Sequence, residues 1–353
     1  MQAVEVPRFN LENGPEEVAA MLLYLQENGY AVCASVASPL EIEAAKASFW
    51  TFTQTVSAVL PTDITTWDDK DWLASPTDGI CSSKGFNHSE FAWNTRCLPK
   101  VKAAFGAIWD TMKLIVSFDA CNVFRPWKYN PSWLTSGGWW HVDQNAMKGP
   151  ERQGKVCIQG LVTYYNATED TGGLCVIPRS HLQHNEVCER CAKGDRSMDF
   201  ISIPKEDDVL RENAGILVCA KAGDLILWDS RTIHCNTPAL TAPDYVRERE
   251  HVASSCSGSS CSSEVMKPEQ LNNNTEIIRL VSYVCMLPKA CANNRCLEQR
   301  RLGFTRRVST SHWPTQKIGI NNRVILDPVD PATCSTEMLA LVGYDIGDED
   351  EDK

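Results

Sequence analysis

The feature that most limits the fold of this chain is a series of short apolar segments in its middle and C-terminal parts. Gly, Pro, Asn and Asp separate them, and they cover residues 114–124, 138–143, 156–165, 173–178, 215–219, 224–228 and 279–286. Segments this short, punctuated by turn-forming residues, are typical of the β-strands of a sandwich or barrel. We therefore predict a mainly β protein over this part of the chain.

The N-terminal part shows helical patterns instead. Residues 16–28 have apolar side chains at helical spacing and stop at Gly29, a suitable C-cap. Pro39 fits the first turn of a second helix that runs to about residue 56, and residues 98–109 are also helical in pattern. Residues 30–36 fit a short strand, whereas residues 62–96 lack a regular pattern, and a loop of that length is usually functional.

Composition and charge exclude several classes of protein. The chain has 353 residues, 43% of them hydrophobic, and a formal net charge of −11 without a long basic block, which argues against general nucleic-acid binding. No segment approaches the roughly 18 consecutive apolar residues of a membrane helix, and the N-terminus lacks the pattern of a secretory signal. We therefore expect a cytoplasmic protein whose 16 cysteines are mostly reduced, with no membrane and no protein partner implied.

Cys188 and Cys191 form one closely spaced pair of cysteines, but a zinc site usually needs two such pairs.

Two segments carry the residues of a metal site. His141 and Asp143 form a His-x-Asp motif, and on a strand residues two apart point to the same face. A third residue, His234, follows the apolar strand of the segment AGDLILWDSRTIH. Two strands of one small barrel can bring these three side chains together, and two histidines with one carboxylate suit a non-haem Fe(II) that activates oxygen. The alternative is that each is an ordinary structural residue.

Arg279 opens the apolar strand RLVSYVCM. A guanidinium buried at the base of such a strand needs a partner, and its planar fork matches a carboxylate in two-point geometry. That partner is either the carboxylate of a ligand or an acid of the protein itself. Arg247 and Arg249 lie nearer to His234 in the sequence but in a charged stretch that no strand follows.

The order of these motifs resembles the phytanoyl-CoA dioxygenase family of Fe(II)- and 2-oxoglutarate-dependent oxygenases. The resemblance runs from about Asn122 to Met286 and rests on His-x-Asp, GGLCVIPRSH, AGDLILWDSRTIH and the strand-opening arginine. It implies a double-stranded β-helix, a jelly-roll or cupin-like barrel with N-terminal helices, together with Fe(II), 2-oxoglutarate and O2. In many relatives the cosubstrate arginine follows the second histidine more closely than Arg279 does here, so we expect residues 240–276 to be a mobile insertion.

The resemblance also implies residue roles. His141, Asp143 and His234 would bind iron, and Arg279 would hold the distal carboxylate of 2-oxoglutarate. Gln159, Asn236 and Asn122 are expected as secondary contacts of the cosubstrate, each with the alternative of being a satisfied polar residue of the barrel. Weaker substrate candidates are Arg125, Arg179, His88 and Trp93. His181 and His184 fit a structural turn of the family.

We expect a single domain over residues 1–344, with a helical part over about 1–113 and a barrel over about 114–330. Residues 345–353 hold six acids and one lysine, so we expect a disordered acidic tail.

The expected function is oxidation of an unactivated C–H bond of a small organic metabolite by hydroxylation, desaturation or ring closure, with release of succinate and CO2. A run of arginines over 295–307 favours an anionic substrate, with a solvated helix face as the alternative. The alternative functions are an acyl-CoA hydroxylase, a cupin that does not use 2-oxoglutarate, or an inactive binding protein.

Overall fold

The computed structural model describes residues 1–82, 84–243, 276–315 and 327–346, and two β-sheets dominate it. The first, the minor sheet, has the strand order β1-β11-β9-β13-β7-β10. Its strands are β1 (Gln2–Glu5), β11 (Ile216–Cys219), β9 (Gly173–Val176), β13 (His234–Thr237), β7 (His141–Val142) and β10 (Ile201–Ser202).

The second, the major sheet, has the order β2-β3-β12-β8-β14-β6-β4, with β5 paired to β14. Its strands are β2 (Arg8–Phe9), β3 (Tyr30–Cys33), β12 (Leu225–Asp229), β8 (Ile158–Thr163), β14 (Arg279–Pro288), β6 (Cys121–Phe124), β4 (Ile80–Cys81) and β5 (Leu114–Val116). β12, β8, β14 and β6 pair antiparallel. The expected mainly β fold with flanking helices is therefore confirmed, with the strands arranged as two sheets.

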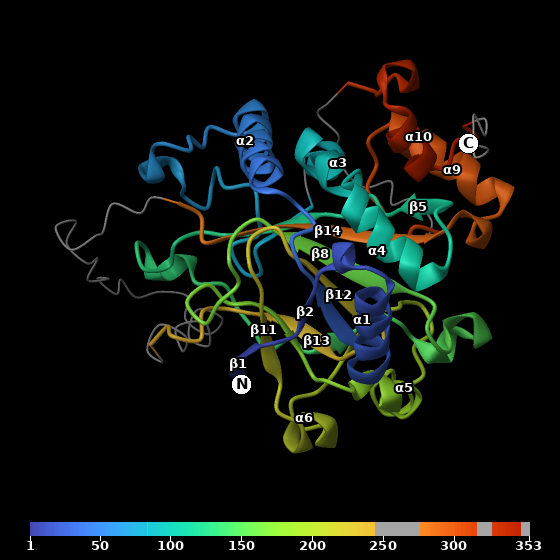
Figure 1. Cartoon of the computed structure of the whole chain (residues 1–353). Helices are drawn as coiled ribbons and strands as arrows, with labels where there is room; N and C mark the ends of the chain where they lie inside the picture. Colours follow the sequence, from blue (N-terminus) through green and yellow to red (C-terminus); the bar gives the residue numbers. More distant parts are fainter. Residues whose placement is uncertain (83, 244–275, 316–326, 347–353) are drawn as a thin grey trace.

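Helices flank both sheets (Figure 1). They are α1 (Pro15–Asn28), α2 (Pro39–Val56), α3 (Glu90–Arg96), α4 (Pro99–Trp109), α5 (His184–Cys191), α6 (Asp208–Glu212), α9 (Asn294–Thr305) and α10 (Thr336–Val342). In the figure α2, α3, α4, α9 and α10 lie on one side of β14 and β8, and α5 and α6 lie on the opposite side of the molecule. None of the helices among the described residues has the length and apolar character needed to cross a membrane.

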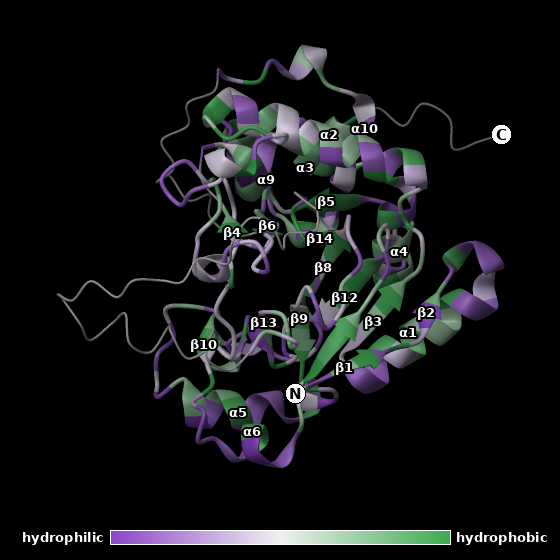
Figure 2. Cartoon of the chain, turned by 90° about the vertical axis from the view of Figure 1, so that its left-hand side faces the viewer, coloured by the Kyte–Doolittle hydropathy of each residue, from purple (hydrophilic) through white to green (hydrophobic). Residues whose placement is uncertain are grey.

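The alternation of side chains along β12 shows why its sequence is apolar at every position. Leu225 and Leu227 belong to the core between the major sheet and the helices, whereas Ile226 and Trp228 belong to the core between the two sheets. A strand that is covered on both faces needs apolar residues on both faces. Figure 2 shows this hydrophobic character in β3, β12 and β8.

Local sequence signals explain where the first helices begin and end. Ser38 and Glu41 form a reciprocal capping box at the start of α2. Gly29 ends α1 in the left-handed conformation, with φ of 80°, and its amide donates to the carbonyl of Leu25.

Three features differ from the sequence expectations. The N-terminal part contains more strands than the one expected over residues 30–36, because β1, β2 and β4 also pair into the two sheets. The 62–96 segment contains a helix, α3, which Ser89 caps. The apolar segment 114–124 is broken into β5 and β6 by a loop over residues 117–120. Most of the expected insertion at 240–276 and most of the acidic tail lie outside the described residues.

The arginine run of α9 holds the C-terminal part of the fold together. The fully buried Arg300 donates hydrogen bonds to the carbonyls of Val342, Pro314, Val116 and Leu341 at 2.6–3.1 Å. Its neighbour in the sequence, Arg301, donates to the carbonyl of Gly343 and pairs with Asp345. Neither side chain is among the residues that line the cavity between the two sheets, so the anionic substrate expected from the arginine run stays a prediction.

We predict that Arg300→Gln lowers the free energy of unfolding by roughly 3 kcal/mol or more, because hydrogen bonds from a charged group contribute about 1.5–3 kcal/mol each. Denaturant unfolding checks this, with Arg295→Gln as the control. Arg295 is exposed on the same helix, and its replacement should change stability by no more than about 0.5 kcal/mol. Equal stability of the two variants would contradict the structural role of Arg300.

Candidate metal and cosubstrate site

Two neighbouring strands of the minor sheet bring two histidines face to face. His234, the first residue of β13, is paired in register with His141, the first residue of β7. Their ring centroids lie 4.2 Å apart. Asp143 follows β7 directly, and its Oδ2 lies 3.3 Å from Nε2 of His234 and 3.6 Å from Nε2 of His141. One ligand atom from each of the three residues lies within 4.8 Å of the others, so the three can hold a metal ion.

Hydrogen bonds on the far side of each ring fix its orientation. Nδ1 of His141 donates to the carbonyl of Trp139 at 3.0 Å, and Nδ1 of His234 donates to the carbonyl of Thr232 at 2.9 Å. Each acceptor lies two residues before its histidine. Because the Nδ1 atoms carry the protons, the Nε2 lone pairs remain free and point toward Asp143, as metal ligands require.

The charges of the triad also suit a divalent metal. Burial raises the pKa of Asp143, but the imidazoles of His312, His141 and His234 outweigh this effect and hold that pKa well below its usual value. Burial and the neighbouring His141 lower the pKa of His234. At neutral pH the site therefore offers a carboxylate and a neutral imidazole, the protonation states that bind metal.

Gln159 supports the carboxylate of the triad. It lies in β8 of the major sheet, and its Nε2 donates to Oδ2 of Asp143 at 2.9 Å. The backbone amide of Asp143 donates to the carbonyl of Ser230 at 3.0 Å, which fixes the chain just after β7. Gln159 thus orients an anionic ligand atom, whereas the sequence predicted a cosubstrate contact for it.

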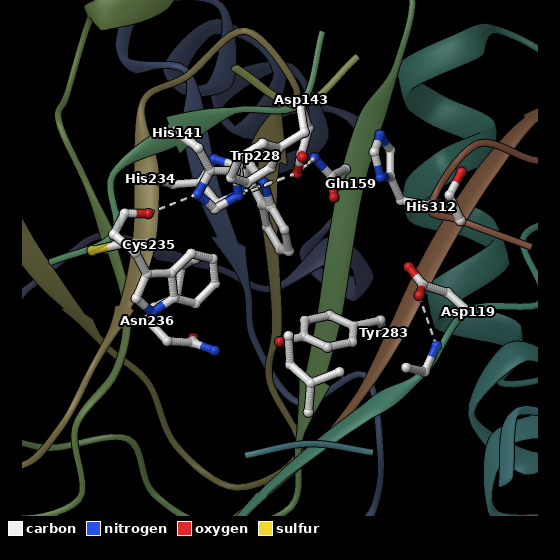
Figure 3. Close-up of a pocket in the computed structure, with 16 residues that line it drawn as sticks. Asp119, His141, Asp143, Gln159, Trp228, His234, Cys235, Asn236, Tyr283 and His312 are labelled. Carbon is white, nitrogen blue, oxygen red and sulfur yellow. Dashed lines mark hydrogen bonds and ion pairs between the residues drawn. The ribbon is translucent and has the colours of Figure 1, made fainter. Parts of the chain in front are cut away.

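The triad opens into a cavity of about 280 Å³ between the two sheets (Figure 3). Apolar side chains form much of its wall, and Trp139 and Phe200 stack on the ring of His141. Their ring centroids lie 4.8 and 4.7 Å from that of His141, with planes 11° and 27° apart. The other lining residues are Ile80, Asp119, Ala120, Asp143, Gln159, Leu174, Trp228, His234, Cys235, Asn236, Tyr283, Ser311 and His312.

Arg279 is buried and has two nitrogen atoms without a partner. Its Nε donates to Oδ1 of Asn122 at 3.1 Å, but neither Nη1 nor Nη2 has a hydrogen-bond partner among the described residues. Burial lowers the pKa of this guanidinium, because the charged form is poorly solvated. The sequence left a protein acid as the alternative partner of Arg279, and no such ion pair occurs in the described part of the chain.

The space around the guanidinium is narrow. A Cβ at Gly173 in β9 would lie 2.8 Å from Nη1 of Arg279, so any side chain at that position would require the guanidinium to shift. Arg279 and Tyr283 point to the same face of β14, since they lie an even number of residues apart. Tyr283 of β14 and Asn236 of β13 both line the cavity, and Tyr283 interacts with Asn236 and electrostatically with Arg279.

Arg279 and Asn122 are not among the residues that line the cavity, and the other sequence candidates also lie outside its wall. Arg125 pairs with Asp69, donates to the carbonyl of Trp67 and lies over the rings of Trp72 and Trp133. His88 is held by the carbonyl of Val308, and burial lowers its pKa to about 3. Trp93 packs against Phe304 and Phe118, and Arg179 is exposed. The structure therefore does not bring these four predicted substrate residues to the cavity.

The two histidines expected to be structural each contact a backbone carbonyl. Nε2 of His181 lies 2.9 Å from the carbonyl of Gln26, and Nε2 of His184 lies 2.6 Å from that of Gln144.

Sequence reasoning missed several residues of the cavity wall. Trp139 and Tyr283 share a strand face with a predicted site residue, so the alternation of side chains along a strand was a usable signal for both. Asp119, Phe200 and His312 reach the cavity from irregular segments far apart in the sequence. No local pattern marks such residues.

Comparisons with known proteins agree with the site. The family model described as phytanoyl-CoA dioxygenase (PhyH) matches residues 25–242. A curated relative, "Ava biosynthesis cluster protein O" of Aspergillus versicolor, is 26% identical over 240 residues, which is 65% of this chain and 65% of the relative's own length. Solved structures with some likeness include the carbocyclase SnoK from nogalamycin biosynthesis, with 14% identity, a TM-score of 0.47 and coverage of 80% of this chain and 87% of that chain. The epimerase SnoN, in complex with Fe3+, alpha ketoglutarate and nogalamycin RO, has 11% identity, a TM-score of 0.47 and coverage of 78% and 85%.

We predict that Asp143→Ala loses tight binding of Fe(II), with an affinity at least roughly a hundredfold lower, because the variant lacks the anionic ligand. Anaerobic calorimetry and the iron content after dialysis measure this. Asp208→Ala removes an exposed acid of α6 and should bind iron like the parent protein. A variant at position 143 that still retains one equivalent of iron would contradict the assignment.

We predict that Gln159→Leu lowers the affinity for Fe(II) by about 10- to 100-fold while leaving the affinity for 2-oxoglutarate of the metal-loaded protein nearly unchanged. The reason is that Gln159 contacts Asp143, and partners that orient a metal ligand have effects of this size. Separate titrations with metal and with 2-oxoglutarate distinguish the two roles. A selective loss of 2-oxoglutarate affinity would instead support the cosubstrate contact predicted from the sequence.

Proposed function

The chain belongs to the phytanoyl-CoA dioxygenase (PhyH) family of non-haem iron oxygenases, and from this premise we propose a specific reaction and specific residue roles. The protein oxidises an unactivated C–H bond of a small organic metabolite at the expense of 2-oxoglutarate and O2, releasing succinate and CO2. Hydroxylation, desaturation and ring closure are the reaction types that this chemistry covers. The observation that carries the proposal is the convergence of two Nε2 atoms and one carboxylate oxygen at the end of an apolar cavity.

The donor set fits the iron of this family. His141, Asp143 and His234 would hold Fe(II) through two imidazoles and one carboxylate, which leaves other coordination positions for the cosubstrate and oxygen. When iron and 2-oxoglutarate are bound, O2 supplies the oxidising power that removes hydrogen from carbon, and the oxidative decarboxylation of 2-oxoglutarate supplies two of the electrons that reduce O2. The side chains of the protein orient the ligand atoms, position the substrate and exclude water.

Arg279 would hold the distal carboxylate of 2-oxoglutarate. Its two unpartnered Nη atoms form a planar fork that matches one carboxylate, and the buried charge requires an anion. Asn122 fixes the fork through Nε, so the role of Asn122 is to position Arg279. Asn236 and Tyr283, which line the cavity, would flank the bound 2-oxoglutarate. This arrangement favours a 2-oxoglutarate-dependent enzyme over a cupin that does not use this cosubstrate.

A small metabolite fits better than an acyl-CoA. The cavity of about 280 Å³ is at the lower end of the size of small-molecule sites. The arginines of the basic run with described partners, Arg300, Arg301 and Arg307, donate to backbone carbonyls and form no cluster that would bind the phosphates of CoA. The name of the curated relative, which places it in a biosynthesis cluster, supports a role in specialised metabolism.

The proposed reaction is tested by reconstitution with Fe(II) under anaerobic conditions, followed by addition of 2-oxoglutarate and oxygen. We expect release of succinate that requires both iron and 2-oxoglutarate, and that increases when a metabolite extract contains the substrate. Succinate release that is independent of iron, or no binding of 2-oxoglutarate to the iron-loaded protein, would contradict the proposal.

We predict that Arg279→Lys binds iron normally but needs roughly ten- to a hundredfold more 2-oxoglutarate. Lysine supplies a point charge without the planar fork, and a lost hydrogen bond between charged groups is worth about 1.5–3 kcal/mol. The measurement is the dependence of succinate release on 2-oxoglutarate concentration, with iron content as the internal check.

Arg125→Lys is the matched control, because Arg125 is also a buried arginine but lies away from the cavity. Its replacement is expected to lower stability and to leave the 2-oxoglutarate requirement nearly unchanged. The two alternatives from the sequence, Arg247 and Arg249, lie outside the described residues and are tested by the same substitution. If either of them controls the requirement and Arg279 does not, the assignment of Arg279 is wrong.

A further inference from the structure

The cavity has a second polar region that neither the metal triad nor the cosubstrate arginine uses. Asp119 and His312 line the same cavity as the triad, from the loop between β5 and β6 and from the segment after α9. Figure 3 shows Asp119 and the two metal-site histidines at opposite ends of this view of the pocket. A substrate that occupies the cavity and places a C–H bond near the metal would therefore extend toward Asp119.

The loop that carries Asp119 is held firmly in place. The amide of Phe118 donates to Oγ1 of Thr310 at 2.8 Å, and the amide of Thr310 returns a hydrogen bond to the carbonyl of Phe118 at 3.1 Å. The buried Arg96 donates to the carbonyl of Asp119 at 2.9 Å. Oδ1 of Asp119 accepts from the amide of Ala120 at 2.7 Å. The carboxylate is thus preorganised, and Oδ2 has no hydrogen-bond partner among the described residues.

His312 provides an independent sign that this wall is built for a ligand. Its Nε2 is buried, yet it has no hydrogen-bond partner in the described structure. Buried polar atoms of native proteins are normally paired, so an unpaired one at a cavity wall indicates a group that a ligand or water satisfies.

The balance of charge favours a particular kind of ligand. In the loaded enzyme the two charges of iron and that of Arg279 are matched by Asp143 and the two carboxylates of 2-oxoglutarate. Asp119 then remains as an acid at the substrate end of the cavity, where the basic groups that act on its charge are His312 and Arg96, whose guanidinium donates to backbone carbonyls and not to the carboxylate. Burial raises the pKa of Asp119, and the nearby His312 and Arg96 oppose this effect. A hydrogen-bond donor or cation on the ligand would stabilise the charged carboxylate, whereas a second carboxylate would be repelled.

The opposite wall favours a flat apolar group. Trp139 and Phe200 stack on His141, and Phe200 keeps 44% of its surface exposed. Because both rings stack on the one imidazole, each can offer only the face turned away from His141 to a ligand ring.

We propose that Asp119 is a specificity-determining residue that accepts a hydrogen bond from an amine or hydroxyl group of the substrate, whose flat apolar body lies against the aromatic wall that Trp139 and Phe200 form around His141. The proposal rests on the proposed function, since it assigns the substrate class of the same site. It differs from the anionic substrate predicted from the arginine run, because the proposed substrate carries a donor group that faces Asp119.

Three probes with the same phenyl ring and two-carbon chain test the proposal: phenethylamine, 2-phenylethanol and 3-phenylpropionate. They are titrated by calorimetry into protein loaded with Fe(II) and 2-oxoglutarate under anaerobic conditions. We expect phenethylamine to bind at least about tenfold more tightly than 3-phenylpropionate, because a charge-assisted hydrogen bond forms only with the donor. The position of 2-phenylethanol in this ranking distinguishes recognition of a hydroxyl from recognition of an ammonium group.

Asp119→Asn should remove this preference without changing the unfolding temperature, because the amide oxygen can still accept from Ala120. Asp208→Asn, which removes the charge of an exposed acid, should keep the preference. Equal or tighter binding of 3-phenylpropionate, no binding of phenethylamine at millimolar concentration, or a preference that persists in Asp119→Asn would each overturn the proposal.

The same titrations with metal-free protein separate this proposal from the proposed function. A preference that depends on Asp119, found in a protein that binds neither iron nor 2-oxoglutarate, would refute the oxygenase reaction and leave the recognition by Asp119 standing. Normal binding of iron and 2-oxoglutarate without the preference would refute only the role of Asp119.

Discussion

The register between β7 and β13 is the constraint on which the site depends. His141 and His234 lie directly opposite each other, and a shift of one residue would turn one imidazole to the other face of the minor sheet. β9 fixes β13 on its other edge, where Val176 pairs with His234 and Leu174 pairs with Asn236. Backbone pairing between β7 and β13 thus places the two histidines opposite each other. The carbonyls of Trp139 and Thr232, each two residues before its histidine, fix the orientation of the two rings.

Hydrogen bonds join the turn between β12 and β13 to the N-terminal part of the chain. The amide of Asp229 and the hydroxyl of Thr232 both donate to the carbonyl of Gly29, the residue that ends α1. A Cβ at Gly29 would lie 2.4 Å from Oγ1 of Thr232 and 2.5 Å from Nδ1 of His181. Glycine is needed there both for its positive φ and for this close approach. The first helix and the metal site are therefore parts of one packed unit.

Buried arginines have two different tasks in this fold. Arg300 uses its nitrogen atoms on backbone carbonyls of α10, β5 and the 314 segment, and Arg96 uses two of its nitrogen atoms on the carbonyls of the 87 and 119 segments. Arg279 instead keeps both Nη atoms free. An unpaired buried charge is costly, so the free Nη atoms of Arg279 support our proposal that a ligand supplies their acceptor.

The sequence alone determined the elements and the chemistry that local patterns encode. Gly29 marked the end of α1 and Pro39 the start of α2, apolar runs marked the strands, and His-x-Asp with a later strand-associated histidine indicated the metal triad. The tertiary structure decided what depends on contacts between distant segments. It gave Arg125 and His88 structural partners, and it gave Arg300 a structural role as well. It also brought Asp119, Phe200 and His312 to one cavity. The physical reason is that the spacing of apolar residues along the sequence shows which face of a helix or strand is buried. Which side chains pack against that face depends on how the helices and strands pack together, and local sequence does not encode it.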